Sequence, residues 1–307
     1  MPNKKAYNIF FCLMQQRVIP ASELIINDDG TIFHLHLRPE QVADTIILVG
    51  DPARVEAIAK RFDKVECRAS NREFNTVTGT YKGKRMSVLS TGIGIGNIDI
   101  CVTELDALAN IDFATRTVKE QHRQLTLVRL GTSGALQPDI ELGEVVYART
   151  SVGFDTLLNY YAGRNEVCDL EIEKAFVEHT AWSELLHRPY FVDSDAELWE
   201  HFKDSVTEGI TIAAPGFYAP QGRYVRLQPA DKDLNTKIES FRYKGRRITN
   251  FEMEGSALAG LARLMGHRAT TMCTIIAQRI AKDAKTDYKP FVEQMISMAL
   301  EKLATLK

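Results

Sequence analysis

The sequence predicts an α/β fold in which helices flank a mainly parallel sheet within a single domain. From Thr45 onward, short β-branched runs alternate with stretches of helical spacing, which is typical of parallel α/β proteins. Glycine-containing turns join several of these strands to the helices that follow. The 307 residues contain no repeat, low-complexity tract or Gly/Ser/Pro-rich linker, so one enlarged domain is favoured over two.

The first strand and helix are clearly marked. Thr45–Val49 is a short apolar run that predicts a buried strand. Gly50 then forms the turn, Asp51 can cap a helix, and Pro52 suits the first helical position, so a helix is expected over Ala53–Phe62. The later elements expected are strands over Arg85–Ser90, Leu125–Leu130, Glu144–Arg149 and Ala269–Ala277, and helices over about 97–109, 170–186, 195–204, 250–265 and 289–306.

Charge and composition exclude several classes of protein. Lys and Arg number 38 against 40 Asp and Glu, and a net charge of −2 argues against a nucleic-acid-binding protein, which needs a cationic surface. The longest apolar run falls short of the roughly 20 residues that cross a bilayer, so no membrane association is expected. Five scattered cysteines without a C-x-x-C pair predict reduced thiols rather than disulfides or zinc, and a cytoplasmic location.

The N-terminal 30 residues are expected to form a leader of uncertain order, followed by the α/β domain over 31–307. Lys4 and Lys5 precede a short apolar stretch, Ile9–Met14, in the manner of a signal peptide. Gln15 and Gln16 follow it, however, and a small-x-small cleavage site is missing. We therefore expect this segment to be a leader or an edge strand, and not an export signal.

Two arginines near strand ends predict an anion site. In a parallel sheet, ligands bind at the carboxyl ends of strands. Arg54 lies one turn into the helix that follows Gly50, so amide donors and a guanidinium can converge on an oxyanion. Arg129 interrupts an apolar strand just before Gly131-Thr132-Ser133-Gly134, and a buried cation needs an anionic partner or ligand. An internal salt bridge remains the alternative for both arginines.

The glycine-rich loops do not match the better-known nucleotide and hydrolase motifs. Gly92, Gly94 and Gly96 are one residue short of the dinucleotide pattern G-x-G-x-x-G. Residues 79–85 lack the spacing of a P-loop, and residues 131–134 do not form the G-x-S-x-G turn of serine hydrolases. A small free oxyanion is therefore a better candidate ligand than a dinucleotide or a nucleoside triphosphate.

Two further groups of polar residues can bind an organic ligand. Glu252 and Glu254 stand at the start of the helix expected over 250–265, where at least one carboxylate faces the sheet edge; favourable placement at a helix N-terminus is the alternative. Gln221 and Arg223 offer an amide that donates and accepts, beside a cation that can stabilise a developing oxyanion. Together they suit a planar ring with adjacent N–H and C=O groups, although a solvated loop is the simpler reading.

With these motifs the sequence resembles the nucleoside phosphorylase family, and within it the uridine phosphorylases. The resemblance runs from about Phe33 to Arg279. It implies a central mixed, largely parallel twisted sheet flanked by helices. The motifs that carry it, in the order of the family, are Phe33-His34-Leu35, Gly50-Asp51-Pro52 with Arg54, Arg72-Glu73-Phe74, Ser90-Thr91-Gly92-Ile93-Gly94, Arg129-Leu130-Gly131-Thr132-Ser133-Gly134-Ala135, Gln221-Gly222-Arg223 and Glu252-Met253-Glu254.

The resemblance also implies which residues bind substrate. Phosphate would be held by Gly50, Arg54, Arg129 and Thr132, with Arg72 supplied by the neighbouring subunit of a dimer or an assembly of dimers. The catalytic groups would be Arg129, Arg223 and Gln221. The nucleoside would be bound by His34, which reaches the ribose 5′-hydroxyl across the same subunit contact, and by Phe217, Gln221, Arg223, Glu252, Met253 and Glu254.

The reaction implied is reversible phosphorolysis of uridine, and of deoxyuridine or thymidine if the pocket permits, to uracil and ribose 1-phosphate. Purine-specific relatives usually carry an Asp after the strand over 271–277, where this chain has Gln278 and Arg279, so a pyrimidine is favoured. A purine nucleoside phosphorylase, a hydrolytic nucleosidase and a non-catalytic nucleoside-binding protein are the alternatives. No metal or organic cofactor is expected, and the loop over 94–97 departs from the pattern that forms a monovalent cation site near Glu73.

Overall fold

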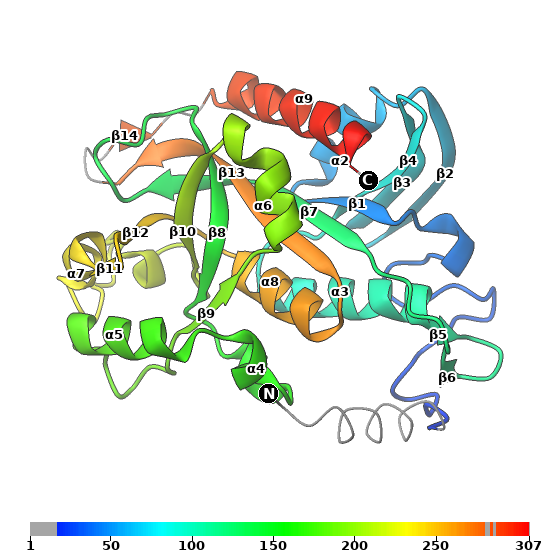
Figure 1. The fold of residues 1–307 in the computed structure, drawn as a ribbon, viewed down its shortest axis with the longest axis horizontal. Coiled ribbons are helices and arrows are strands. Elements are labelled where there is room, and N and C mark those ends of the chain that lie inside the picture. The colour runs from blue at the N-terminus through cyan, green and yellow to red at the C-terminus, as the bar shows by residue number, and fades with distance from the viewer. Residues whose placement is uncertain (1–16, 280–282, 285–286, 307) are drawn as a thin grey trace.

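The computed structural model describes residues 17–279, 283–284 and 287–306, which form one mixed sheet with helices on both faces (Figure 1). The order of its strands is β11-β12-β10-β8-β13-β7-β1-β4-β3-β2. In chain order the strands are β1 (Thr45–Val49), β2 (Lys64–Asn71), β3 (Phe74–Tyr81), β4 (Lys84–Ser90), β7 (Thr126–Ala135), β8 (Val145–Gly153), β9 (Tyr190–Asp193), β10 (Thr207–Ala213), β11 (Arg242–Tyr243), β12 (Arg246–Glu252), β13 (Arg268–Gln278) and β14 (Asp283–Ala284).

The helices lie between these strands, and a separate small hairpin pairs β5 (Ile111–Asp112) with β6 (Thr117–Val118). The α-helices are α2 (Pro52–Ala59), α3 (Ile95–Asn110), α4 (Arg164–Val167), α5 (Leu170–Thr180), α6 (Ala196–Phe202), α7 (Leu234–Ser240), α8 (Gly255–Leu264) and α9 (Lys289–Thr305). Short 3₁₀ turns are η1 (Pro39–Gln41), η2 (Leu157–Tyr160), η3 (Lys203–Ser205) and η4 (Ala219–Gln221).

The sheet consists of two parallel groups joined by an antiparallel pair. Strands β4, β1, β7 and β13 run parallel, as do β8, β10 and β12, and β13 pairs antiparallel with β8. The sheet then bends back on itself, because Phe251 of β12 pairs with Gly134 of β7. Strands β7, β13, β8, β10 and β12 thereby close a ring, and this closure brings the end of β12 to the end of β7.

The core is divided by the sheet into layers. All five residues of β1 are buried, and their side chains alternate between the two faces, as the strand pleat requires. Ile46 and Leu48 pack with α3 and α8, whereas Ile47 and Val49 pack with α2, α6 and α9. A third cluster lies under α5 and α7 and is built around Phe176. The mixed α/β architecture expected from the sequence is therefore confirmed.

Several expected elements occur as predicted. Strands β1, β4 and β13 and helix α9 match their predicted positions within one or two residues. Asp51 caps α2 and accepts a hydrogen bond from Ala53 N at 2.9 Å. Helix α2 ends at Ala59, three residues earlier than expected, and α5 ends at Thr180 rather than near residue 186 because Ala181 takes a left-handed conformation with φ of 47°.

The segment Gly131–Gly134 was expected to be a loop, and this expectation is wrong. Strand β7 continues through it to Ala135, paired with β13 on one side and with β12 at its end. A Cβ atom at Gly131 would collide with the Arg129 guanidinium and would lie 2.9 Å from Cys273 Sγ. Glycine is therefore needed here for side-chain room and not for a turn.

The prediction of a helix over residues 250–265 is also wrong for its first part. Residues up to Glu252 belong to β12, and the helix α8 begins only at Gly255. The β-branched and aromatic run that ends at Phe251 pairs with β10, and this pairing overrides the helical spacing. Strand β10 and the hairpin of β2 and β3 were not predicted; the outer strand of that hairpin is too exposed to show an apolar pattern.

The described part of the expected leader packs on the domain. Ile19 N donates to Arg116 O at 2.8 Å, and Arg116 Nε donates back to Ile19 O at 2.7 Å. Leu24 is buried in the core cluster that contains α3. Residues 1–16 lie outside the described residues. Among the described residues, none of the helices has both the length and the hydropathy required to cross a bilayer.

Candidate active site

A cavity of about 1480 Å³ opens where β1, β7, β12 and β13 end. Most of the residues proposed from the sequence to bind substrate line it, although they come from distant parts of the chain. Those residues are Gly50, Arg54, Arg129, Thr132, Phe217, Gln221, Arg223, Glu252, Met253 and Glu254.

One end of the cavity carries two guanidinium groups. Arg54 projects from the first turn of α2, and its Nη1 donates to Leu130 O at 2.9 Å. Within the described residues, Arg54 forms no ion pair with a carboxylate, and burial together with the neighbouring Arg129 lowers the pKa of Arg54. Two nearby cations repel each other, so an anion between them would relieve both the repulsion and the cost of burial.

Arg129 is held by two carboxylates. Its Nη1 lies 3.1 Å from Glu252 Oε2, and its Nη2 forms an ion pair with Glu254 Oε2. Burial opposes the charge, but Glu254 and Glu252 outweigh it and raise the pKa of Arg129. The salt bridge that the sequence left open therefore exists. Arg129 Nε is buried without a hydrogen-bond partner in the described structure, so the pair of carboxylates does not satisfy the whole guanidinium.

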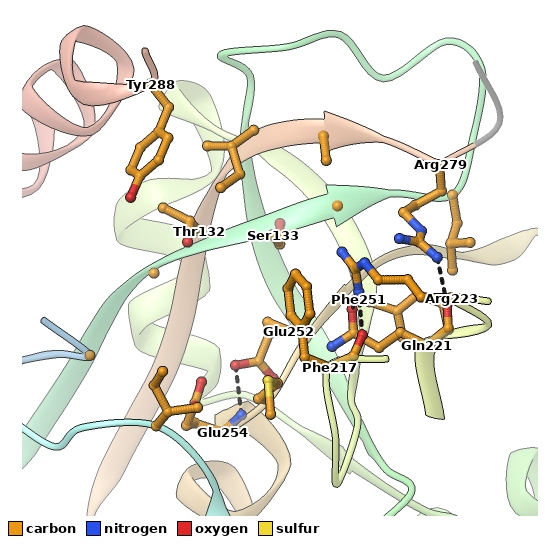
Figure 2. Close-up of a pocket in the computed structure, with 18 of the residues that line it drawn as sticks. Thr132, Ser133, Phe217, Gln221, Arg223, Phe251, Glu252, Glu254, Arg279 and Tyr288 are labelled. Carbon is orange, nitrogen blue, oxygen red and sulfur yellow. Dashed lines mark hydrogen bonds between the residues drawn. The ribbon is translucent and has the colours of Figure 1, made fainter. Parts of the chain in front are cut away.

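The two carboxylates are themselves fixed by backbone groups. At the start of α8, Glu252 accepts a hydrogen bond from Glu254 N at 2.8 Å (Figure 2). It also accepts one from Gly255 N at 2.8 Å. Burial raises the pKa of Glu252, and Arg129 opposes that rise. Glu254 Oε1 accepts from Gly94 N at 2.6 Å, which ties the glycine-rich loop to this site. The carboxylates thus position Arg129 and the loop as well as facing the cavity.

The other end of the cavity carries a planar cation beside an amide. Arg223 Cζ lies 3.6 Å from the centroid of the Phe217 ring, and Arg223 Nη1 donates to Gln221 Oε1 at 2.5 Å (Figure 2). Arg279 Nη2 donates to Gln221 O at 2.7 Å. Burial and the neighbouring Arg279 lower the pKa of Arg223 to about 10. This end therefore offers positive charge and hydrogen-bond donors to an electron-rich planar ring.

The sequence reasoning missed Arg279, Tyr288 and Glu239, which also line the cavity. Arg279 ends β13, and its place after a buried strand was a usable signal. Tyr288 precedes α9 and directs its hydroxyl toward Thr132 (Figure 2), but nothing local in the sequence marks it. Glu239 lies on α7, a helix that was not predicted. Glu73 lines the cavity too.

Two of the proposed residues lie elsewhere. His34 and Arg72 do not line the cavity of their own chain. Asn71, next to Arg72 in the chain, donates through Nδ2 to His34 O at 2.9 Å, so the turn that carries Arg72 contacts the segment that carries His34. Arg72 is exposed in the turn between β2 and β3 with φ of 53°, a conformation that is uncommon for a residue with a side chain.

A cluster of Asp106, His122 and His267 lies outside the cavity, with candidate ligand atoms within 4.8 Å of one another. His267 Nδ1 accepts a hydrogen bond from Leu125 N at 3.1 Å, so the proton of the neutral ring is on Nε2, which donates to Asp106 at 3.1 Å. Neither nitrogen of His267 offers a free lone pair. The cluster is therefore a hydrogen-bonded packing arrangement.

The sequence model of the Phosphorylase superfamily matches residues 44–306, from β1 to the end of α9. The chain belongs to this superfamily. The match begins after His34, so this histidine lies outside the matched residues, whereas every cavity residue described above lies within them.

Named members of the superfamily are similar over most of the chain. A uridine phosphorylase of Thermococcus kodakarensis is 32% identical over 265 residues, covering 83% of this chain and 80% of the relative. A DeoD-type purine nucleoside phosphorylase of Brevibacillus brevis is 28% identical over 276 residues, 88% of this chain and 99% of the relative. A crystal structure of a Trypanosoma brucei nucleoside phosphorylase, described as showing uridine phosphorylase activity, has a TM-score of 0.84 at 27% identity and covers 92% of this chain and all of that chain.

Proposed function

We propose that this phosphorylase-superfamily enzyme is a uridine phosphorylase, a pentosyltransferase that converts uridine and phosphate to uracil and ribose 1-phosphate in pyrimidine nucleoside salvage. The observation that carries the proposal is one cavity with a pair of arginines at one end and the Gln221–Arg223 pair at the other. The uridine phosphorylase of Thermococcus kodakarensis and the uridine phosphorylase activity of the Trypanosoma brucei structure support it.

Phosphate would lie between Arg54 and Arg129, with Thr132 and the amide groups near Gly50 as further donors. Arg54 has no carboxylate partner among the described residues, so a phosphate dianion supplies the counter-charge that this end lacks. Holding phosphate beside the sugar converts attack at C1′ into a step between two positioned groups. No covalent nucleophile on the enzyme is needed.

The ribose would lie between the phosphate and the base, against Met253 and Glu254. Breaking the glycosidic bond builds positive charge on the sugar, and the Glu254 carboxylate is suited to its hydroxyls and to that charge. Because Glu254 is already anchored by Arg129 and by Gly94 N, it can act without rearranging. The same ion pair keeps Arg129 oriented toward phosphate.

The departing base would be stabilised by Gln221 and Arg223, with Phe217 packed beside the ring. Negative charge develops on the uracil oxygens as the bond breaks, and a preorganised guanidinium stabilises it most in the transition state. Arg279 adds a second cation at this end. A purine would instead need a proton donor to its ring nitrogen, and Glu239 of α7 is a cavity-lining carboxylate that could be tested for this role.

We further propose that the working unit is a homodimer, or an assembly of dimers, in which each cavity is completed by the partner. Arg72 would reach the phosphate and His34 the ribose 5′-hydroxyl of the neighbouring subunit. In support, neither residue lines the cavity of its own chain, and the turn that carries Arg72 contacts the segment that carries His34 through Asn71. We also place the enzyme in the cytoplasm, because its described cysteines are free thiols.

The test is a comparison of nucleosides at saturating phosphate. We expect base release from uridine to exceed that from inosine, with deoxyuridine and thymidine between them according to the fit of the ribose and the 5-methyl group. A preference for inosine would contradict the pyrimidine assignment. In that case Glu239→Gln should abolish inosine cleavage, which would identify the proton donor of a purine nucleoside phosphorylase.

A further inference from the structure

The carboxylate of Glu104, in the middle of α3, accepts hydrogen bonds from the loop that carries His34. Its carboxylate accepts from His34 N at 3.1 Å to each oxygen and from Leu35 N at 2.9 Å. Glu104 Oε1 also lies 2.6 Å from His34 Nδ1. The Glu104 side chain is only 12% exposed. Every described hydrogen bond of this carboxylate therefore goes to the loop, and not to its own helix.

The contact with Nδ1 decides which nitrogen of His34 is free. A carboxylate oxygen only accepts, so Nδ1 must carry a proton and donate it to Glu104. In the neutral ring the proton is then absent from Nε2, and Nε2 presents a lone pair. The His34 ring also packs edge-on against two aromatic rings, that of Phe33 at a centroid distance of 4.7 Å and that of Phe74 at 6.5 Å. Tautomer and orientation are thus both fixed.

We infer that Glu104 is a positioning residue for substrate recognition: it holds His34 with Nε2 as an acceptor for the 5′-hydroxyl of the ribose bound in the partner's cavity. This inference rests on the proposed function. It goes beyond it by assigning a role to a residue on α3 that does not line the cavity of its own chain. A hydroxyl donates well to a neutral imidazole nitrogen that is already polarised by a carboxylate on the other side.

The readout is the ratio of kcat/KM for uridine to kcat/KM for 5′-deoxyuridine, which lacks only the hydroxyl that His34 contacts. We expect the wild-type enzyme to favour uridine by about tenfold or more, the size of one hydrogen bond in a preorganised site. Glu104→Ala should bring this ratio close to one. It should do so by lowering the uridine value and leaving the 5′-deoxyuridine value nearly unchanged.

Glu104→Gln keeps the size and one acceptor for the loop amides, so it is the variant that retains the fold if Glu104→Ala does not. Its amide N–H₂ can face Nδ1 only as a donor, which moves the ring proton to Nε2. We expect the ratio to fall here as well. Asp106→Asn is the matched control, because Asp106 lies on the same helix and is bonded to Asn110 and His267 but not to His34. It should leave the ratio at the wild-type value.

A double-mutant comparison separates positioning from general damage. In a His34→Ala background, adding Glu104→Gln should not change the ratio further, because the group through which Glu104 acts is gone. The inference is overturned if Glu104→Gln lowers kcat/KM for both nucleosides equally, or if the wild-type enzyme cleaves both equally well. If the wild-type enzyme cleaves neither nucleoside in the presence of phosphate, the proposed function itself fails, and that result is distinct from the other two.

Discussion

The Arg129 guanidinium lies 3.1 Å from the Glu252 carboxylate, although the two residues are 123 positions apart and belong to β7 and β12. Closure of the sheet between β12 and β7 brings them together. The ion pair thus joins a cation of the proposed phosphate site to carboxylates that are proposed to face the ribose. Arg54, on α2, contributes the second cation without such support. The two arginines therefore differ in what their removal should do.

Replacement of Arg129 should harm both folding and catalysis. Arg129→Ala would leave Glu252 and Glu254 buried without their counter-charge, a loss that typically costs about 3–5 kcal/mol of stability. It would also remove a phosphate ligand. We expect a clear fall in the midpoint of thermal unfolding together with loss of uridine cleavage. An enzyme with unchanged melting temperature and rate would refute the position given to Arg129.

Replacement of Arg54 should affect phosphate alone. Arg54→Met removes a cation whose burial and proximity to Arg129 are unfavourable, and it leaves no described carboxylate unpaired. We expect the KM for phosphate to rise by about 10- to 100-fold, the size of a charge-assisted hydrogen bond, while the melting temperature without phosphate stays the same or rises. Steady-state kinetics and thermal unfolding of the same preparation check this. A rise in the KM for uridine instead of phosphate would mean that Arg54 binds the nucleoside and would contradict its proposed role.

Much of the geometry of the proposed anion site could be predicted from the sequence. Gly50, Asp51, Pro52 and Arg54 form a strand–turn–helix unit whose geometry is local, so the residue types alone indicated it. The pairing of Arg129 with Glu252 could not be predicted, because it depends on the sheet closing on itself. The strand β12 was read as part of a helix for the same reason, since only its neighbours β10 and β7 determine its conformation.

The base end of the cavity was predicted in part. Gln221 and Arg223 were identified as an amide and a cation two residues apart, a feature that the sequence contains directly. Arg279 joins them from β13, and its contact with Gln221 O arises from residues 58 positions apart. Tyr288 and Glu239 reach the cavity from elements whose place in the fold is set by long-range packing, and no local pattern marks them.

The role of Arg223 can be tested through the leaving group. If this arginine stabilises negative charge on the departing base, Arg223→Ala should lower kcat for uridine by about 10²- to 10³-fold. The fall in kcat should be smaller for 5-fluorouridine, because 5-fluorouracil bears negative charge more easily than uracil does. Gln221 is unchanged in this variant, so its proposed contact with the base is retained for both nucleosides. Equal losses for both nucleosides would mean that Arg223 only binds the base in its ground state.

Sharing of the active site between subunits predicts complementation. Arg72→Ala and Arg54→Met should each be nearly inactive at low phosphate, but a mixed dimer has one cavity with Arg54 intact and the partner's Arg72 in reach. If subunits associate at random, co-expression should restore about a quarter of the wild-type rate. Each variant expressed alone is the control. A mixture no more active than its components would argue that each chain completes its own site.

The central claim is that phosphate, and not water, cleaves the glycosidic bond. The most direct measurement follows both products from uridine with and without phosphate, by separating uracil, ribose and ribose 1-phosphate. We expect one ribose 1-phosphate for each uracil released, and no uracil release when phosphate is omitted. Release of uracil with free ribose at an equal rate in both conditions would contradict it and would identify a hydrolytic nucleosidase.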